Sequence, residues 1–159
     1  MDVLIRPAGE ADAAEIRRLA AQLGYPMEID TLLQRLTGIQ ASSWQAVLIA
    51  ELDRQVAGWI YLLAGPDLLT GATGEIGGLV VDEGMRGRGV GKALLEAARE
   101  WAAGQGCPEL RVRSNTAREP YVKAFYLANG YEVVKTQWVL RKRSRGSTAR
   151  DSRPTTGDR

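Results

Sequence analysis

Hydrophobic positions in the first part of the chain change their period from one predicted element to the next. Over residues 12–23 and 29–39 they recur every three or four residues, which predicts two amphipathic helices. Shorter apolar runs predict strands. These runs cover residues 3–6, 46–50 and 56–63. The chain is therefore expected to begin in the order β-α-α-β-β.

The second part of the chain again contains predicted strands and helices, after a loop expected from Gly65 to about Gly74. An apolar run over residues 75–81 predicts a central strand, in which the pair Gly77-Gly78 predicts a bulge or the close approach of another backbone. The complete order, β-α-α-β-β-β-α-β-α-β-β, predicts an α/β (α+β) fold. Its remaining elements are a helix over residues 90–103, a strand over 110–113, a helix over 120–129 and the last strands over 131–141.

Length and composition predict one domain over residues 1–142 and a basic tail over residues 143–159. The chain has 159 residues, of which 45% are hydrophobic, and this is enough for a single core. The tail is mostly Ser, Thr, Arg, Gly and Pro, so we expect it to be disordered. Contact of the tail with nucleic acid or a partner is the alternative.

The same composition excludes several classes of protein. The N-terminus is interrupted by charge too early for a signal peptide and no long apolar run occurs, so a cytoplasmic protein without a membrane segment is expected. With no histidine and a single cysteine, Cys107, we expect no metal site, no internal disulfide and no triad-type nucleophile. Residues 1–140 are mildly acidic, because the tail holds the excess of basic residues, and this argues against nucleic-acid binding.

A basic, glycine-rich segment lies between the predicted central strand and the helix that follows it. Alternate glycines allow positive φ and leave peptide N–H groups uncovered, and the N-terminus of the next helix adds its positive dipole end. An ordinary basic turn is the alternative, but its cations would repel one another unless an anion compensated them. The segment therefore predicts a phosphate site. It comprises Arg86, Gly87, Arg88, Gly89, Val90, Gly91 and Lys92.

The spacing of this segment fits one phosphate-binding template better than two others. A P-loop would need Ser or Thr at Ala93 to bind Mg²⁺, and a dinucleotide fingerprint would need a further glycine at Lys92. What remains is Arg-x-x-Gly-x-Gly, formed by Arg86, Gly89 and Gly91. This pattern resembles the acetyl-CoA pyrophosphate loop of the GCN5-related N-acetyltransferase (GNAT) family.

The resemblance runs over residues 2–142 and includes a second motif. The segment from Lys123 to Tyr131 is similar to the family's Ala-x-x-Phe-Tyr-x-x-x-Gly-Phe/Tyr pattern, although many members have Ala and His where this chain has Val122 and Lys123. The resemblance implies the GNAT acyl-CoA N-acyltransferase fold. That fold has a mixed central sheet of six to seven strands, splayed at the fourth and fifth, and about four flanking helices.

The resemblance also implies a role for individual residues. Acetyl-CoA would be the cofactor, Glu75 would be the general base and Tyr126 would protonate the leaving thiolate and contact CoA. A paired or solvated strand carboxylate is the alternative for Glu75, and a half-buried aromatic residue is the alternative for Tyr126. Asn115 would contact the cofactor or begin a turn. The other expected cofactor-binding residues are Leu79, Val80 and Val81, through their backbones, and the loop residues from Arg86 to Lys92.

The implied activity is direct transfer of an acetyl group from acetyl-CoA to a primary amine. The amine acceptor could belong to a small molecule or to a peptide or protein, because acceptor specificity in the family lies in variable loops, which correspond here to residues 24–30 and 65–73. The alternative is a CoA-binding sensor or interaction module that has lost catalysis. The oligomeric state, a homodimer included, is left open.

Overall fold

The computed structural model describes residues 2–115 and 120–146, which fall into two compact units, Met1–Arg113 and Ser114–Arg159. Each unit is described by itself, so the single domain expected over residues 1–142 stays a prediction. Most of the tail expected to be disordered, residues 147–159, lies outside the described residues. In the described part of the chain, no helix is both long and apolar enough to cross a membrane.

The first unit is built on one sheet with the strand order β1-β2-β3-β4-β5. Neighbouring strands are antiparallel except for β4 and β5, which are parallel, so the sheet is mixed. The strands are β1 (Leu4–Pro7), β2 (Gln45–Leu52), β3 (Gln55–Asp67), β4 (Gly71–Val81) and β5 (Leu110–Val112). The helices of this unit are α1 (Ala13–Gln22), α2 (Ile29–Gln40) and α3 (Val90–Gly104), with the 3₁₀ turns η1 (Glu10–Asp12) and η2 (Glu83–Met85).

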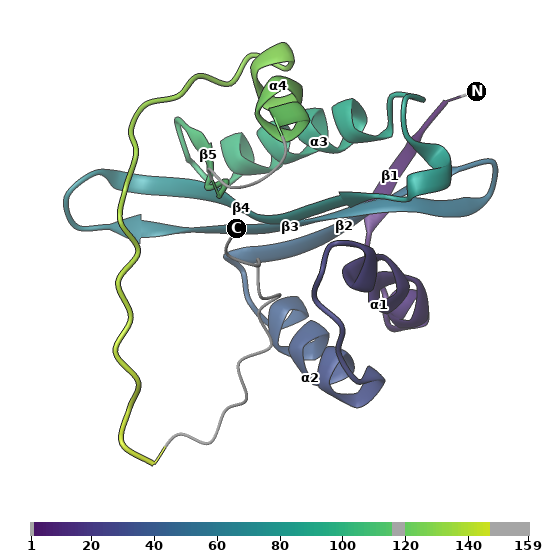
Figure 1. Ribbon diagram of the computed structural model, residues 1–159, viewed down its shortest axis with the longest axis horizontal. Helices are drawn as coiled ribbons and strands as arrows, with labels where there is room; N and C mark the ends of the chain where they lie inside the picture. Colours follow the sequence, from purple (N-terminus) through teal and green to yellow (C-terminus); the bar gives the residue numbers. More distant parts are fainter. Residues whose placement is uncertain (1, 116–119, 147–159) are drawn as a thin grey trace, which may run out of the picture. The chain divides into compact units, whose positions relative to one another are not determined.

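The helices cover both faces of the sheet. Figure 1 shows α1 and α2 on one face and α3 on the other. Alternate residues of β3 therefore point into two different apolar layers. Trp59 packs in a buried cluster with Leu19 of α1 and Leu36 of α2, whereas Ile60 lies on the opposite face and is fully buried.

The sheet has five strands in the described part of the chain, so the prediction of six to seven was wrong. Residues 131–141 were expected to form the last strands, but they follow α4 (Pro120–Ala128) in the second unit without strand pairing. Their apolar side chains are exposed, with Trp138 at 89%. Local sequence can favour a strand, but a strand also needs a partner for its backbone N–H and C=O groups, and the local sequence does not supply one.

The prediction of a loop from Gly65 to Gly74 was also wrong, because most of this segment continues the β3–β4 hairpin. Gly65 pairs with Thr73 and Pro66 with Ala72. Pro66 is tolerated because the ladder between β2 and β3 ends at Leu63, so the missing N–H of the proline breaks no ladder bond on that side. Of the two loops in which acceptor specificity is expected, the one over residues 65–73 is thus mostly a regular hairpin with a short turn.

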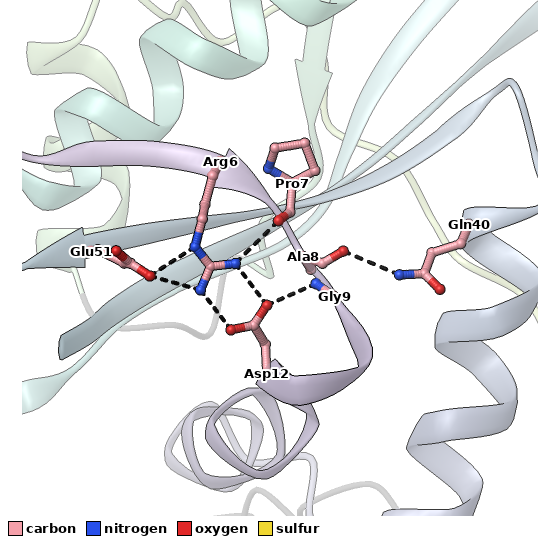
Figure 2. Close-up of polar contacts among 7 residues, drawn as sticks. All are labelled: Arg6, Pro7, Ala8, Gly9, Asp12, Gln40 and Glu51. Atoms are coloured by element: carbon pink, nitrogen blue, oxygen red, sulfur yellow. Dashed lines mark hydrogen bonds and ion pairs between the residues drawn. The ribbon is translucent and has the colours of Figure 1, made fainter. Parts of the chain in front are cut away.

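A network of charged side chains joins β1 to the start of α1 (Figure 2). Arg6 donates to both carboxylate oxygens of Asp12, at 2.8 and 2.7 Å, and to Glu51 of β2 at 2.7 Å. Asp12 is 7% exposed and also accepts from the backbone N–H of Gly9 at 2.7 Å. The hydrogen bond from Arg6 is the largest cause that lowers the pKa of Asp12, so its carboxylate stays charged in the folded protein.

Replacing Asp12 with asparagine should lower the free energy of unfolding by about 2–3 kcal/mol near neutral pH, because Arg6 would lose a charge-assisted partner. A carboxyl group whose pKa is lowered by folding stabilises the protein above its unfolded-state pKa, and that contribution is lost as the pH falls through the folded-state pKa. Urea unfolding should therefore show a smaller difference between the two proteins at acidic pH than at pH 7. Glu96→Gln, which breaks an exposed ion pair with Arg99, is the control and should change stability little. An equal difference at both pH values would contradict the role of the Asp12 charge.

Candidate active site

The central strand β4 has a bulge and, beyond it, a segment without a partner strand on the β5 side in the described part of the chain. Tyr61 pairs with Gly78 and the next residue of β3, Leu62, pairs with Ile76, so Gly77 is the extra residue of a β-bulge. The bulge predicted from the glycine pair is therefore confirmed. Beyond it, β4 continues to Val81, although its ladder with β5 covers only Gly74 to Ile76.

The short ladder leaves backbone groups of β4 available for another extended chain. Within the part of the chain that the structure describes, Leu79, Val80 and Val81 have no strand partner on the β5 side. The side chain of Val80 is buried, at 4% exposure, whereas Leu79 and Val81 are half-buried. An extended ligand segment could pair here with the backbone as an added strand does.

The glycine-rich segment has the expected positive φ at two of its three glycines, whereas Gly91 lies inside α3 without it. Gly87 and Gly89 have φ of 76° and 83°, in the left-handed region, and a Cβ added to either would meet no atom within 4 Å. Gly89 is the N-cap of α3, whose first turn has no side-chain cap and no acidic residue among the described residues. The first N–H groups of this helix are therefore open to an anion.

Two contacts from α1 hold the beginning of this loop. Arg18 forms an ion pair with Asp82 at 2.8 Å, and Gln22 accepts a hydrogen bond from the backbone N–H of Glu83 at 3.2 Å. Burial opposes ionisation of Asp82, but its hydrogen bonds with Arg18 and with the backbone of Gly84 lower its pKa. Sequence reasoning missed these residues. The available signal is that Arg18 and Gln22 lie one turn apart on the polar side of an amphipathic helix.

The far end of the loop is held by the turn between β2 and β3. Arg88 donates from one guanidinium nitrogen to Asp53 at 2.8 Å. Asp53 and Arg54 both have positive φ, 54° and 64°, as a two-residue hairpin turn that matches the strand twist requires. Arg86 and Lys92 are exposed at the same loop. Left-handed glycines, an uncapped helix and exposed cations together fit the diphosphate of a nucleotide cofactor.

Glu75 lies on β4 two residues before the bulge. Its side chain is 35% exposed and its Oε1 atom is 3.3 Å from Nε of Arg113, just beyond β5. It is the cross-strand partner of Leu63, so the two side chains project from the same face of the sheet. Glu75 therefore reaches solvent next to the bulge, and its role as a base stays a prediction.

The remaining predicted residues belong to the second unit. Tyr126 is half-buried on α4, and its ring makes edge-on contacts with Phe125 and Tyr131, with ring centroids 5.2 and 5.4 Å away. Asn115 is exposed. The loop, β4 and Glu75 all belong to the first unit, with Glu75 near the start of β4 and the loop after its end, while the parts of Tyr126 and Asn115 in the site stay predictions.

Comparisons with known proteins agree with this geometry. The sequence profile of the acetyltransferase (GNAT) family matches residues 12–131. An aminoglycoside N(6')-acetyltransferase type 1 from Stenotrophomonas maltophilia is 32% identical over 133 residues, which are 80% of this chain and 85% of the relative. A protein of the same name from Klebsiella aerogenes is 28% identical over 87% of this chain and 95% of its own.

A solved structure with a similar fold was crystallised with a ligand. The structure of AAC(6')-Iy in complex with the bisubstrate analogue CoA-S-monomethyl-acetylneamine has a TM-score of 0.81. It shares 24% identity and covers 91% of this chain and 100% of its own. The likeness at this identity establishes the fold.

Proposed function

The chain belongs to the acetyltransferase (GNAT) family and is an N-acetyltransferase that uses acetyl-CoA, and we propose that it acetylates a primary amine of a small molecule. The geometry of the loop from Arg86 to Lys92 is the observation that best supports naming individual cofactor-binding residues. Its two left-handed glycines and the open N-terminus of α3 fit a diphosphate, and a P-loop or a dinucleotide fingerprint does not match its spacing.

The residues around the bulge would position the reacting groups. When bound, acetyl-CoA supplies the activated acetyl group as a thioester. The backbone of Leu79, Val80 and Val81 would hold the extended arm of the cofactor, and a backbone N–H near Gly77 would donate to the thioester oxygen as negative charge develops there. Such a donor typically contributes about 2.7–4 kcal/mol to the transition state.

Two side chains would move the protons. Glu75 would accept the proton of the attacking ammonium group, directly or through water, because it reaches solvent beside the bulge. Tyr126 would donate its phenol proton to the leaving sulfur, as its place in the family motif implies. Asn115, which follows β5, would be a further cofactor contact. The nucleophile is the amine itself, so no covalent enzyme intermediate is needed.

The identity of the acceptor rests on the relatives. Two relatives with 28% and 32% identity are named aminoglycoside N(6')-acetyltransferases, and the name describes a small molecule with primary amines. This supports a small-molecule amine over a peptide or protein amine. It also favours an active enzyme over a CoA-binding module that has lost catalysis.

A thiol-release assay on the full-length protein tests the proposed function. With acetyl-CoA and a panel of small primary amines, we expect amine-dependent release of CoA, and Tyr126→Phe should lower kcat about 10²-fold while CoA still raises the melting temperature. Acetylation of peptide amines alone would replace the small-molecule acceptor. Binding of CoA without transfer to any amine would identify the inactive module.

A further inference from the structure

The sheet face beneath α1 and α2 continues beyond these helices toward the bulge. At the covered end, Trp59 is buried with Ile49 and Val80, and its indole N–H donates to the carbonyl of Ile16 in α1 at 3.3 Å. Two residues further along β3, Tyr61 is only partly buried, and Leu63 beyond it is half-buried as well. The face therefore changes from closed core to partly open surface next to the bulge.

The strand register places three polar side chains on this open part. Gln45 of β2 and Glu75 of β4 are both cross-strand partners of Leu63. Tyr61 shares their face, because it lies two residues from Leu63 on the same strand. Gln45, Tyr61 and Glu75 thus project from one side of the sheet, and all three are partly accessible.

The ring of Tyr61 lies against the bulge. A Cβ atom added to Gly77 would lie 2.7 Å from Cδ1 of Tyr61 and 2.7 Å from Cδ1 of Leu63, so only glycine leaves room for both side chains. Gly77 is the residue near which the thioester is expected. The phenol ring therefore forms a wall of the site at the place where an amine acceptor would approach.

The polar atoms of this wall match a hydroxyl group. The phenol of Tyr61 donates to Oε1 of Gln45 at 2.7 Å, and burial raises the pKa of this phenol, so it stays protonated. The amide nitrogen of Gln45 makes no hydrogen bond to any residue that the structure describes. The pair can thus offer an N–H donor from Gln45 and the lone pairs of the Tyr61 oxygen, and a hydroxyl group accepts from the first and donates to the second.

We propose that Gln45 and Tyr61 bind a hydroxyl group of the acceptor beside the amine that Glu75 deprotonates, so that the enzyme prefers primary amines that carry a neighbouring hydroxyl group. The inference rests on the proposed function, because it assigns specificity within the same site. It adds two residues that the sequence motifs do not indicate. In this proposal, the negative charge of Glu75 attracts the ammonium group. The uncharged side chains of Gln45 and Tyr61 form hydrogen bonds with the neighbouring hydroxyl group and so select acceptors that have one.

Steady-state kinetics with two matched amines test this inference. A methyl glycoside of 6-amino-6-deoxyglucose and cyclohexylmethylamine both carry a primary amine on a carbon attached to a six-membered ring, and only the first has hydroxyl groups. For the full-length protein we expect a higher kcat/KM with the sugar. Tyr61→Phe should lower kcat/KM for the sugar about 10-fold, mainly through KM, and leave the values for cyclohexylmethylamine and acetyl-CoA unchanged.

The variant keeps the ring that fills the space at Gly77, so the fold should be retained, and a thermal melt verifies this. The control is Tyr121→Phe, which removes the hydroxyl group of a tyrosine that is 57% exposed on α4. It should leave kcat/KM unchanged for both amines. If Tyr61→Phe lowered kcat/KM equally for both amines, or did not lower it for the sugar, the inference would be overturned. Acetyl transfer to cyclohexylmethylamine by the wild-type protein would still support the proposed function. Transfer to no amine at all would overturn both.

Discussion

Replacing Gly89 with valine is expected to lower kcat/KM for acetyl-CoA at least about 10²-fold and to remove most of the thermal stabilisation by CoA. The φ of 83° at this position is strained for a β-branched residue, and the new side chain would project into the open space where the diphosphate must approach the first turn of α3. The stabilisation of the wild-type protein should be about 2.7 kcal/mol at a hundredfold excess of CoA over Kd. Thermal melts with and without CoA, together with initial rates, measure both effects.

The matched control for this variant lies at the other end of the same helix. Gly104→Val introduces the same side chain into open space at the last residue of α3, where φ is not positive. It should change the melting temperature modestly, through helix propensity, and leave the CoA-induced shift intact. If Gly89→Val bound CoA as well as the wild-type protein, the assignment of this loop to the diphosphate would be wrong.

Replacing Glu75 with glutamine should lower kcat about 10³-fold with little change in the KM for acetyl-CoA. The substitution preserves the shape of the side chain but removes the group proposed to accept the ammonium proton, and general base catalysis typically contributes about 10²–10⁴-fold. Because Glu75 is partly exposed and its contact with Arg113 is 3.3 Å, the melting temperature should change little. Initial rates at saturating amine and acetyl-CoA measure the loss.

A neighbouring glutamate provides the control for Glu75. Glu109 lies just before β5, is 65% exposed and forms an ion pair with Arg111 at 3.1 Å, so Glu109→Gln removes the same charge from a similar pair. Its kcat should match that of the wild-type protein. A Glu75→Gln variant with wild-type kcat would show that water or the substrate handles the proton.

Elements with a strong local signal were predicted closely from the sequence. The helix expected over residues 90–103 is observed as Val90–Gly104, and the one expected over residues 29–39 as Ile29–Gln40. A helix satisfies its backbone hydrogen bonds within the segment, so period, capping and stop residues are all readable locally. The glycine loop belongs to the same class, because positive φ and an uncapped helix N-terminus are local properties.

Strand limits depended on pairing and were predicted less well. β3 continues through Pro66, where the sequence predicts a loop, and this proline breaks no ladder bond because the ladder between β2 and β3 ends at Leu63. Residues 131–141 show the converse error, since strands were expected there although the sequence names no pairing partner. Both errors have one cause, which is that the partner of a strand lies elsewhere in the chain.

The sequence by itself determined the family, the cofactor and the position of the glycine-rich loop that we propose as the phosphate site, because motif spacing and backbone preference act over a few neighbouring residues. Only the tertiary structure decided which distant side chains lie beside the proposed site. The pair Arg88–Asp53 spans 35 positions and joins the loop after β4 to the turn between β2 and β3, and the pair Tyr61–Gln45 spans 16 and is brought together by the register of β2 and β3. Gly77 likewise leaves a space at the bulge, but the side chains that fill it, those of Tyr61 and Leu63, come from the neighbouring strand. Such contacts arise from pairing across the sheet, which no local pattern encodes.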